Sequence, residues 1–197
     1  MNIGAVLLAA GQSSRFGKNK LLEDFCGTPV VCRAMDALCQ VKASRMAVVT
    51  GCREVAALGR SHGFSVIVND APQAGLSHSI ALGVRAMADM DAVLLMAADM
   101  PLLTGDSLCA LVRAFVAGGY PAACLGDETH WGNPALFSRA CFDALCALAG
   151  DRGAKGVLRS LEDRVLVVPC LHPGELTDAD TPQLLAQLAK VARTNHG

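Results

Sequence analysis

The feature that most constrains the fold of this chain is an alternation between short apolar runs and stretches with helical spacing. Runs rich in Val, Ile and Leu have the length and composition of strands buried on both faces, at 3–10, 46–50, 64–68, 92–97 and 165–169. Between them, apolar residues recur at helical spacing over 29–38, 53–62, 77–88, 106–117, 138–148 and 182–192. This alternation predicts an α/β fold: a mostly parallel sheet with helices on both faces, in a three-layer α/β/α sandwich.

The length of the chain indicates one domain. Its 197 residues are enough for one full-sized core and too few for two ordinary domains with a linker. No repeat or low-complexity segment interrupts the alternation. We therefore expect a single domain over 1–197.

Composition excludes several classes of partner. The net charge is −1, so a broad basic face for nucleic acid or anionic lipid has no support. The longest apolar runs are about half of the ~20 residues that a membrane span needs. The N-terminus lacks the basic lead-in of a secretory signal, and none of the nine cysteines forms a CxxC pair. We expect a cytoplasmic protein with reduced cysteines, and neither nucleic acid nor membrane as a partner.

The loop after the first predicted strand, LAAGQSSRFGKNKLL, is rich in Gly, Ser and cations. It is not a dinucleotide fingerprint, because Ser13 stands where Gly is needed, and it is not a P-loop, because five residues separate Gly11 from Gly17. Free amides, hydroxyls and cations could still bind a polyanion, although a solvated connection has the same spacing. The residues concerned are Ser13, Ser14, Arg15, Lys18 and Lys20.

A carboxylate follows the fourth predicted strand in AADMPLLT. Ligands of open α/β sheets bind beyond the carboxyl ends of the strands, where Asp99 is well placed to hold Mg²⁺ beside substrate phosphates. The alternative is a helix cap, for which Thr104 and Asp106 are better placed.

A second acidic segment, LTDADTPQLL, precedes the last predicted helix. Asp180 or Thr181 could be its N-cap, with Pro182 in the first turn. Carboxylates two apart on an extended segment point to opposite sides, so only one of Asp178 and Asp180 is expected to face a metal held by Asp99.

Three glycine-bearing loops complete the candidate site. Gly75, Ser77 and Ser79 open a helix and could hold a ribose or phosphate, or could form an ordinary helix start. The segment 131–134 has the composition of a tight turn, in which the Asn133 amide could read a base edge. The loop 150–156 carries Arg152 and Lys155, either for the charge of an acceptor or as a plain surface loop.

Together these segments resemble the cytidylyltransferases and guanylyltransferases of molybdenum-cofactor maturation, which belong to the nucleotidyltransferases with a Rossmann-like fold. LAAG with Ser13, Arg15, Gly17 and Lys20 is similar to the family's phosphate-binding signature. GLSHSI resembles its Gly-x-Ser-x-Ser helix start, AADMP its metal-binding segment and DADTP its C-terminal motif. GNPALFSRACFDAL and GDRGAKGVL resemble the cytidylyl branch.

The resemblance implies an enzyme that transfers CMP from CTP to the terminal phosphate of a molybdenum-bearing pterin. It implies catalytic roles for Arg15, Lys20 and Asp99, with Mg²⁺ (or Mn²⁺) on Asp99 and Asp180. It also implies acceptor or base contacts at Asn133, Arg152 and Lys155, and a molybdenum hydroxylase apoenzyme as the recipient. The implied nucleotide-binding residues are Leu8, Ala9, Ala10, Gly11, Ser13, Ser14, Gly17, Gly75, Ser77 and Ser79.

Two sequence details favour CTP over GTP. Ala10 precedes the loop glycine where guanylyl relatives usually have another glycine, and DADTP has carboxylates where they tend to have Asn. Other interpretations remain: a guanylyltransferase, a cytidylyltransferase for a sugar or isoprenoid alcohol phosphate, or a non-catalytic chaperone that delivers the finished cofactor to a hydroxylase.

Overall fold

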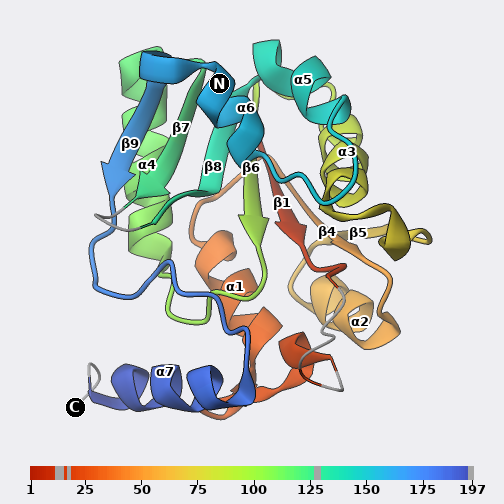
Figure 1. Cartoon of the computed structure of the whole chain (residues 1–197), viewed down its shortest axis with the longest axis vertical. Helices are drawn as coiled ribbons and strands as arrows, with labels where there is room; N and C mark the ends of the chain where they lie inside the picture. The colour runs from red at the N-terminus through yellow and green to blue at the C-terminus, as the bar shows by residue number, and fades with distance from the viewer. Residues whose placement is uncertain (12–15, 17–18, 127–129, 195–197) are drawn as a thin grey trace.

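A computed structural model describes residues 1–11, 16, 19–126 and 130–194. Its centre is a sheet in the order β5-β4-β1-β6-β8-β7-β9 (Figure 1). Only β8 runs antiparallel to its neighbours, so the predicted mostly parallel sheet is confirmed. The strands are β1 (Ile3–Leu8), β4 (Arg45–Thr50), β5 (Ser65–Val68), β6 (Ala92–Ala97), β7 (Ala122–Gly126), β8 (Trp131–Ser138) and β9 (Val165–Pro169).

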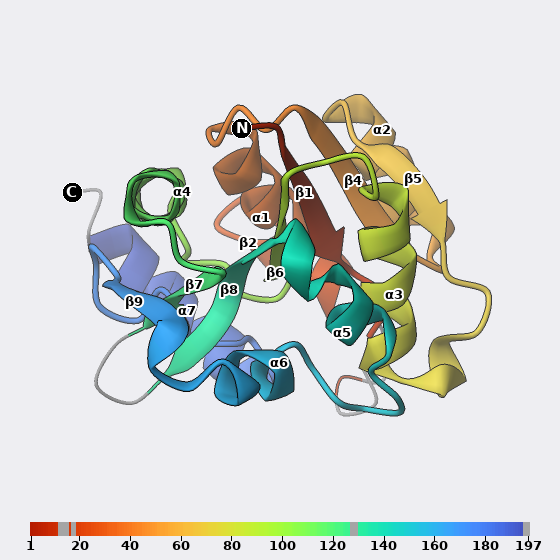
Figure 2. The same ribbon diagram turned by 90° about the horizontal axis from the view of Figure 1, so that it is seen from above.

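Helices cover both faces of the sheet because neighbouring strand residues point in opposite directions (Figure 2). In β1, Ala5 and Leu7 join one core cluster, and Val6 joins the other. The first cluster packs under α1 (Val30–Cys39), α2 (Arg53–Ser61), α4 (Gly105–Gly118) and α7 (Pro182–Thr194). The second packs under α3 (Leu76–Ala86), α5 (Phe142–Cys146) and α6 (Lys155–Ser160).

Short elements connect these layers. A two-stranded ribbon of β2 (Asp24–Phe25) and β3 (Thr28–Pro29) leads from the first loop into α1. The 3-10 turns are η1 (Lys20–Leu22), η2 (Pro72–Ala74), η3 (Arg139–Cys141) and η4 (Glu162–Arg164).

The prediction of a tight turn at 131–134 is wrong, because β8 begins at Trp131. Gly132 has a φ of 104°, the Asn133–Pro134 peptide is cis, and the register with β7 shifts opposite this point. Residues that usually mark turns therefore form an irregular strand start here. The predicted helix over 138–148 is also shorter, since a 3-10 turn precedes α5.

A buried carboxylate that the sequence analysis did not identify joins the C-terminal segment to α4. The Glu175 side chain is 1% exposed. Its Oε1 accepts hydrogen bonds from the backbone N–H (2.9 Å) and the hydroxyl of Thr104, and its Oε2 accepts from the Ser107 hydroxyl (2.6 Å) and the His172 N–H (3.1 Å). Because these bonds satisfy both oxygens, they anchor the chain shortly before Asp178.

None of the helices in the described ranges combines the length and the apolar character that crossing a membrane requires.

Candidate functional site

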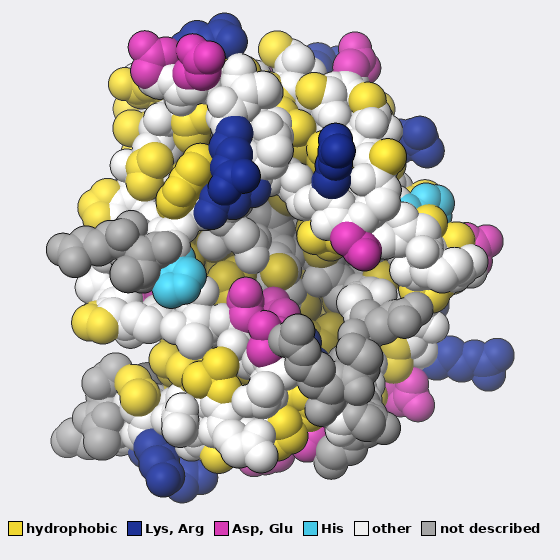
Figure 3. Space-filling view, viewed as in Figure 1, with side chains coloured by type: hydrophobic (Ala, Val, Ile, Leu, Met, Phe, Trp, Pro, Cys, Tyr) yellow, Lys and Arg dark blue, Asp and Glu magenta, His cyan; other side chains and the backbone are white. Residues whose placement is uncertain are grey.

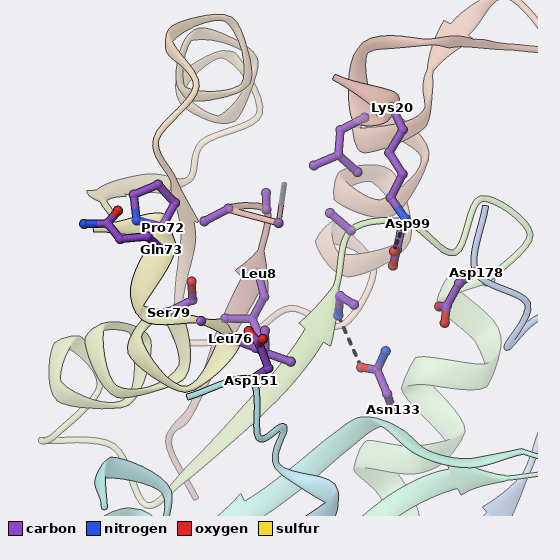
Figure 4. A pocket seen from close by; sticks show the side chains of 17 residues that line it. Leu8, Lys20, Pro72, Gln73, Leu76, Ser79, Asp99, Asn133, Asp151 and Asp178 are labelled. Carbon is purple, nitrogen blue, oxygen red and sulfur yellow. Dashed lines mark hydrogen bonds and ion pairs between the residues drawn. The ribbon is translucent and has the colours of Figure 1, made fainter. Parts of the chain in front are cut away.

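A pocket of about 580 Å³ opens beyond the carboxyl ends of β1 and β6. Figure 3 shows a hollow in the middle of this face with acidic side chains beside it, and Figure 4 shows the residues that line it. The lining comes from three regions: the first loop (Leu8, Ala9, Ala10, Gly11, Lys20, Leu21), the start of α3 (Pro72, Gln73, Gly75, Leu76, Ser79), and the ends of β6 and neighbouring segments (Ala97, Ala98, Asp99, Asn133, Asp151, Asp178).

Strand pairing fixes where the two principal loops leave the sheet. The Ala9 N–H donates to the Val49 carbonyl at 2.9 Å, and the Ala98 N–H donates to the Leu8 carbonyl at 3.1 Å. Hydrogen bonding to the neighbouring strand thus continues for one residue after the end of β1, at Ala9, and for one residue after the end of β6, at Ala98. The chain then diverges at Ala10 and at Asp99, which opens the pocket between them.

Lys20 lies between two carboxylates at the edge of this pocket. Its Nζ is 2.7 Å from Asp99 Oδ2 and 2.8 Å from Asp180 Oδ1. The Asn19 side chain accepts from the Leu21 N–H and starts the 3-10 turn that carries Lys20. Burial lowers the pKa of Lys20, but Asp99 and Asp180 outweigh burial and raise that pKa above its usual value. Lys20 is therefore a firmly charged ammonium.

The second carboxylate oxygen of Asp99, Oδ1, is in a different condition. Asp99 Oδ1 is buried and accepts no hydrogen bond from any described residue. A buried carboxylate oxygen in this condition is costly, so its position in a ligand pocket points to a missing donor or cation.

The segment of Asp178 and Asp180 is not extended as the sequence analysis assumed, and the expectation that only one of the two faces a metal held by Asp99 stays a prediction. The Ala179 N–H donates to the Asp99 carbonyl at 2.8 Å, and the Asp180 N–H folds back to the Asp178 carbonyl at 3.0 Å. Asp178 lines the pocket and Asp180 contacts Lys20. Both carboxylates of the DADTP motif therefore lie near Asp99 and Lys20.

Asp178 has a perturbed ionisation. Much of its side chain is open to solvent, but the pocket wall removes part of the hydration of its carboxyl group. That desolvation, with repulsion from Asp99 and Asp180, raises the pKa of Asp178 to about 6, and Lys20 offsets only part of the effect. Asp178 therefore holds its proton to a higher pH than an ordinary aspartate does.

The start of α3 is held by a buried asparagine that the sequence analysis missed. Asn69 directly follows β5 and is 2% exposed. Its Nδ2 donates to the Ser79 hydroxyl at 2.9 Å, and its Oδ1 accepts from the Ala71 N–H at 3.0 Å. Asn69 thus fixes both the Ser79 hydroxyl and the chain that leads to Gly75.

Gly75 permits close contact between two loops of the pocket. Its backbone has a φ of 85° and a ψ of −178°, a conformation that is almost confined to glycine. A Cβ at this position would lie 2.5 Å from the Gly150 carbonyl and 2.7 Å from Asp151 Oδ1. The Ser77 N–H also donates to the Gly150 carbonyl at 3.2 Å.

Asn133 lines the opposite wall. Its Oδ1 accepts from the Ala97 N–H at 3.2 Å, and its Nδ2 contacts Met100 Sδ at 3.7 Å. The amide therefore supports the end of β6, and contact with a base stays a prediction.

Three of the predicted site residues, Ser77, Arg152 and Lys155, do not line the pocket. Ser77 is buried and donates its backbone N–H to the Gly150 carbonyl, and Arg152 is exposed. The Lys155 ammonium lies 4.7 Å from the centre of the Trp131 ring. Among the described residues, the lining includes none of these three. Ser13, Ser14, Arg15, Gly17 and Lys18 lie outside the described residues.

The donor set fits a divalent cation that is completed by substrate. Within the described part of the chain, no group of three or more His, Cys, Asp or Glu side chains is arranged to hold a metal by itself. Mg²⁺ is, however, commonly bound by one or two carboxylates together with substrate phosphates. Asp99 and Asp180 converge on one point at Lys20 Nζ, which satisfies that requirement.

Comparison with known proteins identifies the family. Residues 5–170 match the MobA-like NTP transferase domain. The chain belongs to the MobA-like NTP transferase family. Purine catabolism protein PucB of Bacillus subtilis is 30% identical over 190 residues, which cover 90% of this chain and 91% of PucB.

Two further similar proteins agree with this assignment. A probable molybdenum cofactor guanylyltransferase of Pyrococcus horikoshii is 29% identical over 118 residues, which cover 58% of this chain and 57% of that protein. The solved structure of a nucleotidyl transferase from Methanothermobacter superposes with a TM-score of 0.84 at 25% identity, over 98% of this chain and 99% of that one. The chain is therefore a nucleotidyltransferase of this family, with the family's Rossmann-like fold.

Proposed function

We propose that this nucleotidyltransferase transfers CMP from CTP to the terminal phosphate of a molybdenum-bound pterin and releases pyrophosphate. The observation that carries the proposal is the Lys20–Asp99 pair in the pocket beside Gly11, where one Asp99 oxygen accepts no hydrogen bond from the described residues. This arrangement offers a cation for phosphates and an anion for a metal within one side-chain length.

The reaction needs alignment more than a strong base. A phosphomonoester is already an anion at neutral pH, and its oxygen attacks the α-phosphorus of CTP. The bond from the α-phosphorus to the bridging oxygen of the β-phosphate breaks, and pyrophosphate leaves with that electron pair. Lys20 and the amides of the first loop would contact the β- and γ-phosphates and stabilise the charge on the leaving group. Arg15 is proposed to do the same.

Asp99 and Asp180 would hold Mg²⁺ (or Mn²⁺). When bound, such an ion neutralises charge on the α-phosphate and on the acceptor. Asp178 adds a third carboxyl group at this side of the pocket. Ser79, held by Asn69, would contact the sugar or a phosphate from the opposite wall.

The preference for CTP is supported by Ala10, which lines the pocket. A methyl group at this position narrows the space over which a base can lie, and a pyrimidine needs less room than a purine. Guanylyl transfer is the second candidate, because the Pyrococcus horikoshii relative bears that name. We further propose a molybdenum hydroxylase apoenzyme as the recipient of the product.

The test is a turnover assay with the molybdenum pterin, Mg²⁺ and each of the four nucleoside triphosphates. We expect kcat/KM for CTP to exceed that for GTP by about tenfold or more, a discrimination of about 1.4 kcal/mol that pocket shape can supply. Comparable values, or a preference for GTP, would overturn the cytidylyl proposal. Sugar and isoprenoid alcohol phosphates serve as competing acceptors, and faster turnover with either would overturn the pterin proposal.

A further inference from the structure

The Lys20 ammonium lies where a divalent cation would bind. Its Nζ is 2.7 Å from an oxygen of Asp99 and 2.8 Å from an oxygen of Asp180. Mg²⁺ binds carboxylate oxygens at about 2.0–2.1 Å. An ion held by these same two oxygens would therefore overlap Nζ, so the ammonium and the ion exclude each other in this arrangement.

The free energy needed to move the Lys20 ammonium away from Asp99 and Asp180 depends on whether another anion is bound in the pocket. The Lys20 side chain is 15% exposed and that of Asp99 is 20% exposed, so neither charge is fully hydrated. Removing one partner of such a pair leaves a poorly solvated charge, which is strongly unfavourable. A triphosphate in the same pocket would offer Lys20 new anionic partners at the moment when it leaves the two carboxylates.

We propose that Lys20 is an internal counter-ion that closes the Asp99–Asp180 pair to a free divalent cation until a triphosphate takes over the ammonium. The proposal rests on the proposed function for the divalent cation at Asp99 and Asp180 and for the triphosphate that takes over the ammonium. It does not depend on which base or acceptor the enzyme prefers.

Two consequences follow from the exchange of partners. The nucleotide-free protein binds a divalent cation weakly, although two carboxylates converge there. Triphosphate and metal strengthen each other's binding. The triphosphate draws the Lys20 ammonium away from the two carboxylates, and the metal displaces the same ammonium toward the triphosphate, so the coupling is reciprocal. Lys20 would thus make metal binding conditional on substrate.

The first experiment titrates nucleotide-free protein with Mn²⁺ and follows the EPR signal of the free ion. Lys20→Met, which removes the competing charge, is expected to bind Mn²⁺ about tenfold or more tightly than the wild type. Lys20→Arg should remain as weak as the wild type. Lys42→Met is the matched control, because it removes one positive charge, as Lys20→Met does. Lys42 is exposed and precedes the start of β4, at the end of that strand opposite to its carboxyl end.

The proposal is overturned if Lys20→Met binds Mn²⁺ no more tightly than Lys42→Met. It is also overturned if the gain persists when Asp99→Asn is added to Lys20→Met, because the ion would then lie elsewhere. Circular dichroism checks the fold of each variant, and Lys20→Gln replaces Lys20→Met if that protein does not fold.

A second experiment tests the transfer of the ammonium in the wild-type chain. The protein is labelled at lysine ¹³Cε, and the Lys20 resonance is assigned by its loss in Lys20→Arg. Inorganic tripolyphosphate with EDTA should shift that resonance, since the ammonium changes partners without metal or base. An unchanged resonance with tripolyphosphate bound refutes the transfer, whereas the nucleotide assay above is unaffected by this outcome.

Discussion

Replacing Gly75 with alanine tests whether the close contact between Gly75, just before α3, and Gly150 and Asp151 of the loop 150–156 shapes the pocket. Any side chain at a φ of 85° and a ψ of −178° costs about 1–3 kcal/mol in backbone strain. The new Cβ would also lie 2.5 Å from the Gly150 carbonyl, so the two loops must separate, which adds about 1–3 kcal/mol of overpacking. Gly75→Ala should therefore lower the free energy of unfolding by about 2–6 kcal/mol.

Gly63→Ala provides the matched control. Gly63 also has a positive φ, 82°, but a Cβ there would meet nothing within 4 Å. We expect this variant to lose about 1–2 kcal/mol from the left-handed conformation alone. The difference between the two variants contains the contact with Gly150 and any excess strain of the Gly75 backbone.

Urea unfolding followed by circular dichroism measures both free energies, and steady-state pyrophosphate release measures turnover. Gly75→Ala should also lose turnover, because Gly75, Leu76 and Asp151 line the pocket, whereas Gly63→Ala should retain it. Equal losses of stability in the two variants, or normal turnover in Gly75→Ala, would refute the argument that this contact holds the pocket in shape.

Three other changes test the remaining walls of the site. Asp99→Asn should reduce kcat by about 10²-fold or more through loss of charge stabilisation, and a variant with near wild-type turnover would remove Asp99 from the site. Asn69→Ala should weaken nucleotide binding, measured by calorimetry, because Ser79 loses its hydrogen bond, and unchanged affinity would contradict that positioning role. The raised pKa of Asp178 predicts that wild-type stability relative to Asp178→Asn is greatest below about pH 4 and falls as the pH rises through about 6, the folded-state pKa. Urea unfolding of both proteins from pH 4 to 7 checks this sign, and a difference that is constant with pH would show that Asp178 is not perturbed.

The sequence predicted those parts of the fold that depend on local pattern. Runs such as 92–97 are apolar enough for strands buried on both faces, and the alternation with helices determines a mostly parallel sheet. β7 was not predicted because its sequence, AACLG, is rich in small residues with low strand propensity. The start of β8 was misread because Gly132 and Pro134 normally mark turns.

In the candidate site, too, residues marked by a local sequence pattern were predicted, and residues that depend on tertiary contacts were not. Lys20 and Asp99 were identified because each follows a strand whose carboxyl end reaches the pocket. Asn69 was missed because its role depends on a tertiary hydrogen bond to Ser79 in α3. The turn between Asp178 and Asp180 was not predicted because it follows from the hydrogen bond between the main chains of Ala179 and Asp99. Such bonds leave no periodic trace in a sequence.

The hydrogen bond from the Ala179 N–H to the Asp99 carbonyl has a consequence for how this pocket can change over evolution. It joins the two acidic segments through main-chain atoms, which every non-proline residue supplies. The spacing of the segments is therefore independent of the side chains at 178 and 180. Substitutions at those two positions can alter charge or hydrogen bonding while the frame stays in place, so the same scaffold can acquire a different nucleotide or acceptor preference by point mutation.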